Sequence, residues 1–127
     1  MEKLTILSLA SGLARHASFR HSVIAENVAN ADTPGYRARS VEDFSAAVNR
    51  EFTLRATRPG HVGAGPGTVA FQTAAAEDGP QAAPNGNSVN IEDQAMQATA
   101  ANGQHRLATT VYSKVMDILR IGLGPNR

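Results

Sequence analysis

Side chains that could share one helix face recur along the first thirty residues. Steps of four and three separate them: Ile6, Ala10, Leu13, Ala17, Arg20, Ile24 and Asn27. This period predicts one helix over residues 3 to 31, about 40 Å long at 1.5 Å per residue. A helix this long with few large apolar groups favours packing against a second helix, although a simple amphipathic surface helix also fits the pattern.

The end of this helix is marked by a proline and a glycine. Pro34 disfavours helical backbone at Thr33, and Pro34 with Gly35 suits the two central positions of a type II turn. The second of those positions requires positive φ, which glycine adopts without strain. We therefore expect the chain to change direction between Asp32 and Tyr36.

A shorter amphipathic segment follows, from Val41 to about Phe52. Its apolar face is predicted to hold Val41, Phe44, Val48 and Phe52. Ser40 and Asp43 fit a capping box with the acid at the third helical position. We expect a short helix that begins directly after Ser40.

Residues 53–88 differ in composition from both flanks. They contain six Gly and four Pro among 36 residues, and few large apolar groups. Such a composition does not form a packed domain. It predicts a long excursion with one or two short strands, one of them over Gly67 to Thr73, and a surface loop over Ala74 to Asn87.

The last part of the chain returns to helical spacing. One stripe holds Ala95, Ala98, Ala101, Ala108, Val111, Val115 and Ile118, and an adjoining stripe holds Tyr112, Met116 and Leu119. Asn90 is the expected N-cap, with Glu92 and Asp93 in the favourable first turn. Asn102 and Gly103 interrupt the pattern with poor helix formers.

These elements predict a mainly α fold. The long N-terminal and C-terminal helices would pack as a coiled-coil-like pair, and a loop-rich middle insert would hold the short strands. The corresponding divisions are residues 1–31 for the first helix, 32–88 for the turn, short amphipathic segment and insert, and 89–127 for the last helix.

Composition points to a protein that completes its core against partners. Leu, Ile, Val and Phe together account for 26 of 127 residues, close to the level below which chains do not fold alone. Twelve basic and 11 acidic side chains give a net charge of +1, which excludes the basic patches typical of nucleic-acid binding. No apolar run is long enough for a membrane span, and Glu2 with a short apolar stretch argues against a cleaved signal peptide.

Catalytic and metal-binding patterns are weak. No Cys is present, and His16 and His21 are five residues apart, about 140° around a helix, so they cannot share a metal ion. Glycines at 60, 63, 65 and 67 lack the lysine of a phosphate-binding loop. We expect no catalytic residues, no cofactor and no metal.

One stretch is more specific than any of these patterns. Residues 26–39, Glu-Asn-Val-Ala-Asn-Ala-Asp-Thr-Pro-Gly-Tyr-Arg-Ala-Arg, resemble the signature of the flagellar basal-body rod and hook family, in which an N-terminal helix ends in an Asn-rich turn. Asn85-Gly86-Asn87-Ser88-Val89-Asn90, before the last helix, and the small size resemble the proximal rod proteins of that family. Residues 57–62 are similar to a Thr-x-x-x-His segment of the family.

The resemblance implies a structural protein without catalytic activity, placed in the periplasmic rod of the flagellar basal body. Implied partners are other copies, other rod proteins, the small adaptor FliE, the membrane-embedded ring and the flagellar type III export apparatus, which would export the chain without a cleaved signal. Neither nucleic acid nor a direct membrane span is implied.

The resemblance also suggests roles for particular residues. Asn27 and Asn30 would bridge the helix end to neighbouring backbone or, alternatively, cap their own helix, and the turn from Asp32 through Thr33, Pro34 and Gly35 to Tyr36 would fix subunit geometry. Predicted helix interfaces comprise Ile6, Leu13, Ile24, Val28, Val111, Val115, Ile118 and Leu119. Phe44 with Val48 fits a docking pattern for the export gate, as does Phe19 with Val23, and ordinary core packing explains either pair.

Two other classes of protein remain open on sequence alone. A secreted helical adaptor or effector could use the same stripes to bind a partner helix. A small enzyme is the third reading, although no activated nucleophile, metal set or cofactor motif supports it.

Overall fold

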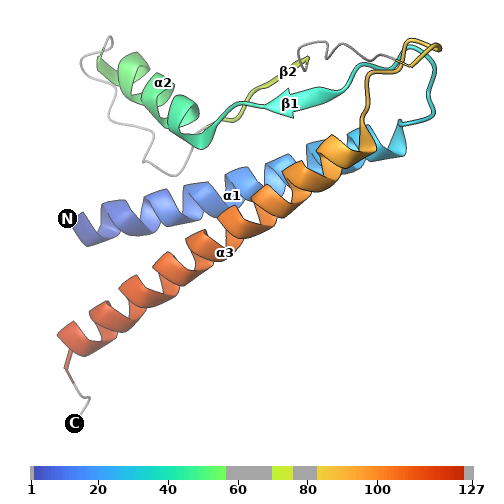
Figure 1. Ribbon diagram of the computed structural model, residues 1–127. Helices are drawn as coiled ribbons and strands as arrows, with labels where there is room; N and C mark the ends of the chain where they lie inside the picture. Colours follow the sequence, from blue (N-terminus) through green and yellow to red (C-terminus); the bar gives the residue numbers. More distant parts are fainter. Residues whose placement is uncertain (1, 57–69, 76–82, 125–127) are drawn as a thin grey trace.

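The structure is a computed structural model that describes residues 2–56, 70–75 and 83–124. In chain order it contains α1 (Glu2–Ala29), β1 (Arg39–Val41), α2 (Phe44–Ala56), β2 (Thr73–Ala75) and α3 (Ile91–Gly122), shown in Figure 1. The glycine string at 60–67, the segment 57–62 and the side chain of Phe52 lie outside the described part. Within the described segments, no helix combines the length and apolar character needed to cross a membrane.

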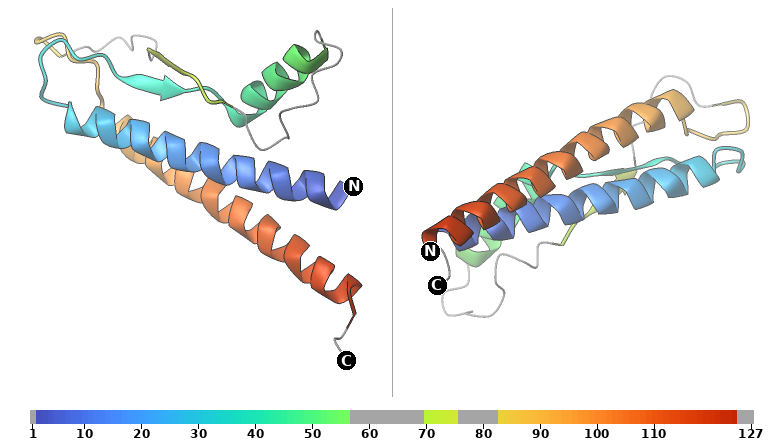
Figure 2. Two further views of the ribbon diagram at one scale, coloured as in Figure 1. Left: turned by 180° about the vertical axis from the view of Figure 1, so that it is seen from behind. Right: turned by 90° about the horizontal axis from the view of Figure 1, so that it is seen from below.

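The two long helices pack together as the sequence predicts, and they run antiparallel. The end of α1 lies beside the start of α3, and the two chain termini lie at the opposite end, where the helices are farther apart (Figures 1 and 2). The buried residues of α3 are Gln94, Ala101, Ala108 and Val115. They repeat every seven residues, which is the period of a coiled-coil seam. The mainly α fold class is therefore confirmed.

Small side chains line much of this seam. Ala17 on α1 and Ala101 on α3 are fully buried, and Ala10 and Ala108 are nearly so. Alanine keeps full helix propensity and leaves space for the neighbouring backbone to approach. Packing in this seam therefore depends on close contact of two backbones more than on large side chains.

The insert covers a second face of α1. In Figures 1 and 2, α1 lies between α3 and a layer formed by β1, β2 and α2. The two strands pair antiparallel, with Arg39 opposite Ala75 and Val41 opposite Thr73. A helix covered on both sides buries more of its circumference, and the buried residues of α1 are Ala10, Gly12, His16, Ala17, Val23 and Asn27.

Two expectations for the insert were wrong in position. The strand expected over Gly67 to Thr73 is found at Thr73–Ala75, so the two share only Thr73, and Ala74 and Ala75 were expected to be loop. Its partner is Arg39–Val41, whose last residue, Val41, was expected to begin a helix. The strands are short and owe their position to backbone pairing with each other, which a propensity pattern does not report.

The predicted capping box was also wrong. Ser40 lies in β1, and α2 begins at Phe44, directly after Asp43. The carbonyl of Asp43 accepts a hydrogen bond from the N–H of Ala47, so Asp43 occupies the cap position, not the third helical position. Pairing of β1 with β2 delays the start of the helix by three residues.

The last helix agrees with its predicted cap but not with the expected interruption. Oδ1 of Asn90 accepts hydrogen bonds from the N–H groups of Glu92 at 2.9 Å and Asp93 at 3.3 Å. The helix then continues unbroken through Asn102 and Gly103. Burial of the neighbouring Ala101 against α1 outweighs a glycine penalty of about 1 kcal/mol.

We expect Ala101→Leu to lower the free energy of unfolding by about 1 to 3 kcal/mol, because three added carbons have no space in a seam of fully buried alanines. Ala100→Leu is the matched control, since Ala100 is exposed on the same helix and its substitution should change stability by less than about 0.5 kcal/mol. Thermal unfolding followed by circular dichroism measures both. Equal effects of the two substitutions would contradict the close-packed seam.

Candidate functional site

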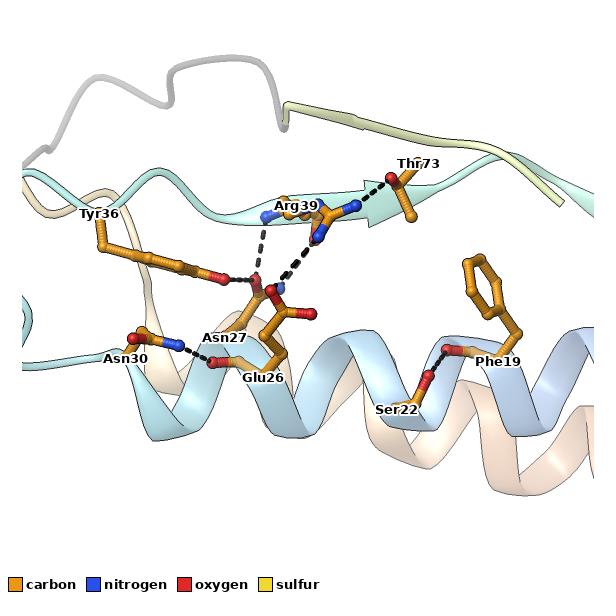
Figure 3. Close-up of polar contacts among 8 residues, drawn as sticks. All are labelled: Phe19, Ser22, Glu26, Asn27, Asn30, Tyr36, Arg39 and Thr73. Carbon is orange, nitrogen blue, oxygen red and sulfur yellow. Dashed lines mark hydrogen bonds and ion pairs between the residues drawn. The ribbon is translucent and has the colours of Figure 1, made fainter.

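A buried asparagine joins three elements at the end of α1. Asn27 is 1% exposed, and its Nδ2 donates to the carbonyl of Arg39 at 2.8 Å and to Oε1 of Gln94 at 3.0 Å. Its Oδ1 accepts from the N–H of Arg39 at 3.0 Å and from the hydroxyl of Tyr36 at 3.2 Å, as Figure 3 shows in part. The amide therefore pairs with both backbone groups of Arg39 and also holds α3.

Asn30 behaves differently from Asn27. Its Nδ2 donates to the carbonyl of Glu26 in the preceding turn at 2.8 Å, and its Oδ1 accepts from the hydroxyl of Thr33 at 3.2 Å (Figure 3 shows the first). These are local contacts that satisfy the helix end. Of the two roles considered from the sequence, the bridging contacts belong to Asn27 and the capping contacts to Asn30.

The turn after α1 has the geometry that Pro34 and Gly35 predict. The N–H of Tyr36 donates to the carbonyl of Thr33 at 3.2 Å, and Gly35 has a φ of +73°. Both are features of a type II turn. Asp32, Thr33 and Pro34 are exposed, whereas Tyr36 is half-buried beside Asn27.

A second segment, far along the chain, docks onto this turn. Asn87 is 3% exposed, and its Nδ2 donates to the carbonyls of Asn30 at 2.8 Å and Thr33 at 2.7 Å. Its Oδ1 accepts from the N–H of Val89 at 2.8 Å. One amide thus gives a second hydrogen bond to two carbonyls at the end of the first helix and in its turn, each of which already accepts from a backbone N–H three residues later.

Backbone contacts complete the docking. The N–H of Gly35 donates to the carbonyl of Asn85 at 2.9 Å, and the N–H of Ser88 donates to the carbonyl of Tyr36 at 3.0 Å. Gly86 also has positive φ, at +82°, and a Cβ there would lie 3.5 Å from the Cα of Gly35. We call this set the helix-end joint: Asn27, Asn30, residues 33–36, residues 85–88 and Gln94.

The sequence pointed to one half of the joint more clearly than to the other. Asn87 was noted only within a family-like segment and received no role of its own, and Gln94 received none. Asn-Gly-Asn-Ser is a pattern of turn residues with side chains that bond to nearby backbone. That signal identifies a turn but not which distant carbonyls it will cap.

The predicted helix-interface residues fall into two groups. Leu13, Ile24, Val111 and Leu119 are half-buried, and Val115, on the buried stripe of α3, is 8% exposed. Three others remain largely exposed: Ile6 at 42%, Val28 at 45% and Ile118 at 52%. Only the exposed group is free to contact another molecule without opening the helix pair.

The two phenylalanine patterns lie in the contact layer between α1 and the insert. Phe44 is half-buried, with its ring 3.4 Å from where a Cβ on Gly12 would lie, and Val48 is half-buried. The ring centre of Phe19 lies 6.0 Å from that of Phe71, and Val23 is buried. These contacts place both patterns in internal packing.

The described residues contain no group of three His, Asp or Glu side chains close enough together to hold a metal ion. The helix-end joint is held by hydrogen bonds of amide and hydroxyl groups. A charged contact lies at its exposed edge, where Arg39 contacts Glu26 at 3.3 Å and Oγ1 of Thr73 at 2.6 Å (Figure 3). The arrangement fixes the relative position of elements.

Comparison with known proteins matches the part of the chain that builds this joint. The family model for the flagella basal body rod protein matches residues 6–37, which include most of α1 and the whole turn. The match supports a structural component of the flagellar rod and confirms the family resemblance seen in the sequence.

A relative within that family is the flagellar basal body rod protein FlgB of Agrobacterium fabrum (strain C58). The two are 36% identical over 66 residues, which cover 50% of this chain and 49% of the relative. The chain thus spans about half the length of the curated relative it matches. Both matches are to flagellar basal-body rod proteins, in agreement with the resemblance seen in the sequence.

We expect Asn27→Asp to lower the free energy of unfolding by about 2 to 4 kcal/mol at neutral pH. The change removes the donor to Arg39 and Gln94 and places a buried carboxylate against two oxygens that can only accept in this arrangement. Asn102→Asp, the same change at an exposed position of α3, is the control. Urea unfolding measures both, and a loss at Asn27 no larger than the control would disprove the role of Asn27.

The turn makes a separate prediction. Gly35→Val should lower stability by about 1 to 3 kcal/mol because a β-branched residue is strained at positive φ, although no atom within 4 Å would clash with its Cβ. Gly35→Asn should retain much of the stability, since asparagine tolerates this conformation. Gly103→Val, at an open position of α3 without positive φ, serves as the control and should cause no loss. Chemical denaturation distinguishes the three, and equal effects of Val and Asn at position 35 would contradict a positive-φ turn.

Proposed function

We propose that this chain is a structural subunit of the proximal part of the flagellar basal-body rod and assembles helically through its terminal helices. The observation that carries the proposal is the rod-family match over residues 6–37. That match covers the helix, Asn27 and the turn of the helix-end joint. A joint of this kind serves a protein whose task is to present two helices in one fixed arrangement.

The exposed apolar side chains support assembly. On α1 they are Ile6, Leu9 and Val28, and on α3 they are Ile91, Met96, Leu107, Tyr112, Met116, Ile118 and Ile121, followed by Leu123 at the helix end. Several lie near the chain ends, where α1 and α3 have moved apart (Figure 1). Large exposed apolar surfaces on a small protein mark sites of interaction.

A helical array adds a requirement that a single binding event does not have. Every copy must present its surfaces in the same pose, because a small angular error repeats at each subunit contact. The buried amides of Asn27 and Asn87 meet this requirement with directional hydrogen bonds, which apolar contacts lack. Their position at the end opposite the termini leaves the exposed apolar ends available to neighbours.

The proposed partners are those that the family resemblance implies. They are other copies, other rod proteins, the adaptor FliE and the membrane-embedded ring, with the flagellar type III apparatus exporting the chain without a cleaved signal to the periplasmic rod. If Phe44 and Val48 are read by the export gate, recognition must precede folding, because both are half-buried against the rest of the chain. We propose no catalytic role.

A secreted helical adaptor is the alternative, because the same exposed stripe of α3 could bind one partner helix. The two proposals differ in the assembly they produce. A rod subunit forms layers with helical symmetry in purified basal bodies, whereas an adaptor forms a complex of fixed, small number.

We expect Ile118→Glu to prevent incorporation into the rod while leaving the isolated chain folded, because Ile118 is 52% exposed and a carboxylate in a subunit contact would be desolvated. Ser113→Glu, at an exposed polar position of α3, is the control for added charge. Val115 is unsuitable because it is buried inside the chain's own helix pair. Immunoblots of purified basal bodies at matched export levels measure incorporation, and normal incorporation of Ile118→Glu would refute this interface.

A further inference from the structure

The chain contains two Asn-Gly pairs, which lie in different surroundings. Asn85-Gly86 belongs to the helix-end joint, where the segments after α1 and before α3 lie side by side (Figure 1), and Asn102-Gly103 lies within α3. All four residues are exposed, so water has access to both pairs. Asparagine is chemically labile, and a following glycine makes it most reactive because glycine has no side chain to hinder attack on the amide.

Such a pair reacts by attack of the chain on itself. The backbone nitrogen of the glycine loses its proton and bonds to Cγ of the asparagine, and the C–N bond of the side-chain amide breaks to release ammonia. Water then opens the resulting five-membered imide at one of its two carbonyl groups. One product is aspartate, and the other is isoaspartate, whose main chain runs through the former side chain and is longer by one carbon.

In the joint, the groups that this attack uses are already engaged. The N–H of Gly86 donates to the carbonyl of Ala83 at 2.8 Å, which holds the proton on the attacking nitrogen. Oδ1 of Asn85 accepts from the N–H of Asn87 at 3.1 Å, and the carbonyl of Asn85 accepts from the N–H of Gly35 at 2.9 Å. Attack on Cγ therefore requires this turn to open.

The turn is held closed from inside and from outside. Inside it, the N–H of Ala83 donates to the carbonyl of Asn87 at 2.9 Å. From outside, the side chain of Asn87 donates to the carbonyls of Asn30 and Thr33. A short turn without such docking has little stability of its own and opens readily. The protection of Asn85 therefore depends on docking of the turn against the end of α1.

The other pair is protected by a different part of the structure. Asn102 and Gly103 lie in the middle of α3, between the buried Ala101 and Ala108. N–H groups in a helix interior donate to carbonyls of the preceding turn, and opening there disrupts the helix pair. An event that opens only the joint leaves this pair closed. Asn102 is thus a control present in every molecule.

We propose that Asn85 is a self-modification site whose reactivity is controlled by docking of the helix-end joint. While the turn lies on the end of α1, Asn85 is stable. In a chain whose joint stays open, Asn85 converts to aspartate and isoaspartate with release of ammonia. A chain that has not docked is therefore marked by a covalent change at the joint itself.

The space around the turn explains why the isoaspartate form cannot dock again. A Cβ on Gly86 would lie 3.5 Å from Cα of Gly35, so the two segments already touch. One more main-chain carbon between residues 85 and 86 pushes the turn against Gly35 or lifts Asn87 from its two acceptors. Because the Asn87 side chain is 3% exposed when docked, its lost hydrogen bonds are not replaced by water unless the joint opens.

Peptide mass spectrometry of the full chain, incubated at mildly alkaline pH, measures conversion at each asparagine. In urea we expect Asn85 and Asn102 to convert at similar rates, and in the folded chain we expect both rates to fall by at least about tenfold, since reaction then requires opening. A folded Asn87→Ala chain should convert Asn85 about tenfold faster than the folded wild type, because two hydrogen bonds that hold the turn are lost. The rate at Asn102 should not change.

Two results of this experiment would overturn the proposal. Conversion of Asn85 in the folded wild-type chain at its rate in urea would show that the joint gives no protection. An equal rise at Asn85 and Asn102 in the folded Asn87→Ala chain would assign the protection to the stability of the whole chain and not to docking.

The product itself gives a test that does not depend on the folding of Asn87→Ala. An Asn102→Gln chain, which lacks the other Asn-Gly pair, is converted in urea and refolded, and its isoaspartate form is separated by chromatography. We expect hydrogen exchange at the N–H groups of Gly35 and Ser88 to become at least about tenfold faster in this form. Asn85→Asp, which adds the same charge without lengthening the main chain, should keep both amides protected. Equal protection in the isoaspartate and Asn85→Asp chains would overturn the proposal.

Discussion

The burial of one amide side chain is the constraint on which the rest of the structure depends. Asn27 lies where three elements meet, and at that depth each unpaired donor or acceptor would cost about 1 to 3 kcal/mol. Its four contacts satisfy both amide atoms only when Arg39, Tyr36 and Gln94 are all in place. The positions of the turn, of β1 and of the start of α3 are thus linked through a single side chain.

The two ends of the helix pair are stabilised by different forces. At the turn end, directional hydrogen bonds of Asn27 and Asn87 define one arrangement. Along the seam, alanines contribute close backbone approach but little apolar area. Toward the termini, apolar side chains remain exposed. The chain's own hydrogen bonds therefore fix the relative position of the helices at the turn end, while apolar side chains near the termini remain partly exposed.

Much of the helical framework was predictable because it depends on local patterns. The buried stripe of α3 through Ala101, Ala108 and Val115, the Asn90 cap and the positive φ of Gly35 follow from spacing and residue type alone. The start of α2 did not, because Arg39 to Val41 pair with a strand more than thirty residues away. Nor did the role of Asn87, whose acceptors lie on a turn more than fifty residues earlier. The start of α2 and the role of Asn87 depend on hydrogen bonds between residues far apart in the sequence, and the spacing of apolar residues gives no information about such bonds.

The docking of Ser88 beside the turn has a consequence for how such a chain can vary. Its N–H bonds to the carbonyl of Tyr36, and its Oγ accepts from the N–H of Ala38. These bonds join the two ends of the segment between Ala38 and Ser88. The chain therefore enters and leaves this segment at the same place beside the helix pair, whatever the length of the segment. Doubling the length of a closed loop costs only about 0.6 kcal/mol in chain entropy. Residues can therefore be inserted between β1 and Ser88 at little cost while the helix pair, and the contact of Asn27 with Arg39, stay as they are.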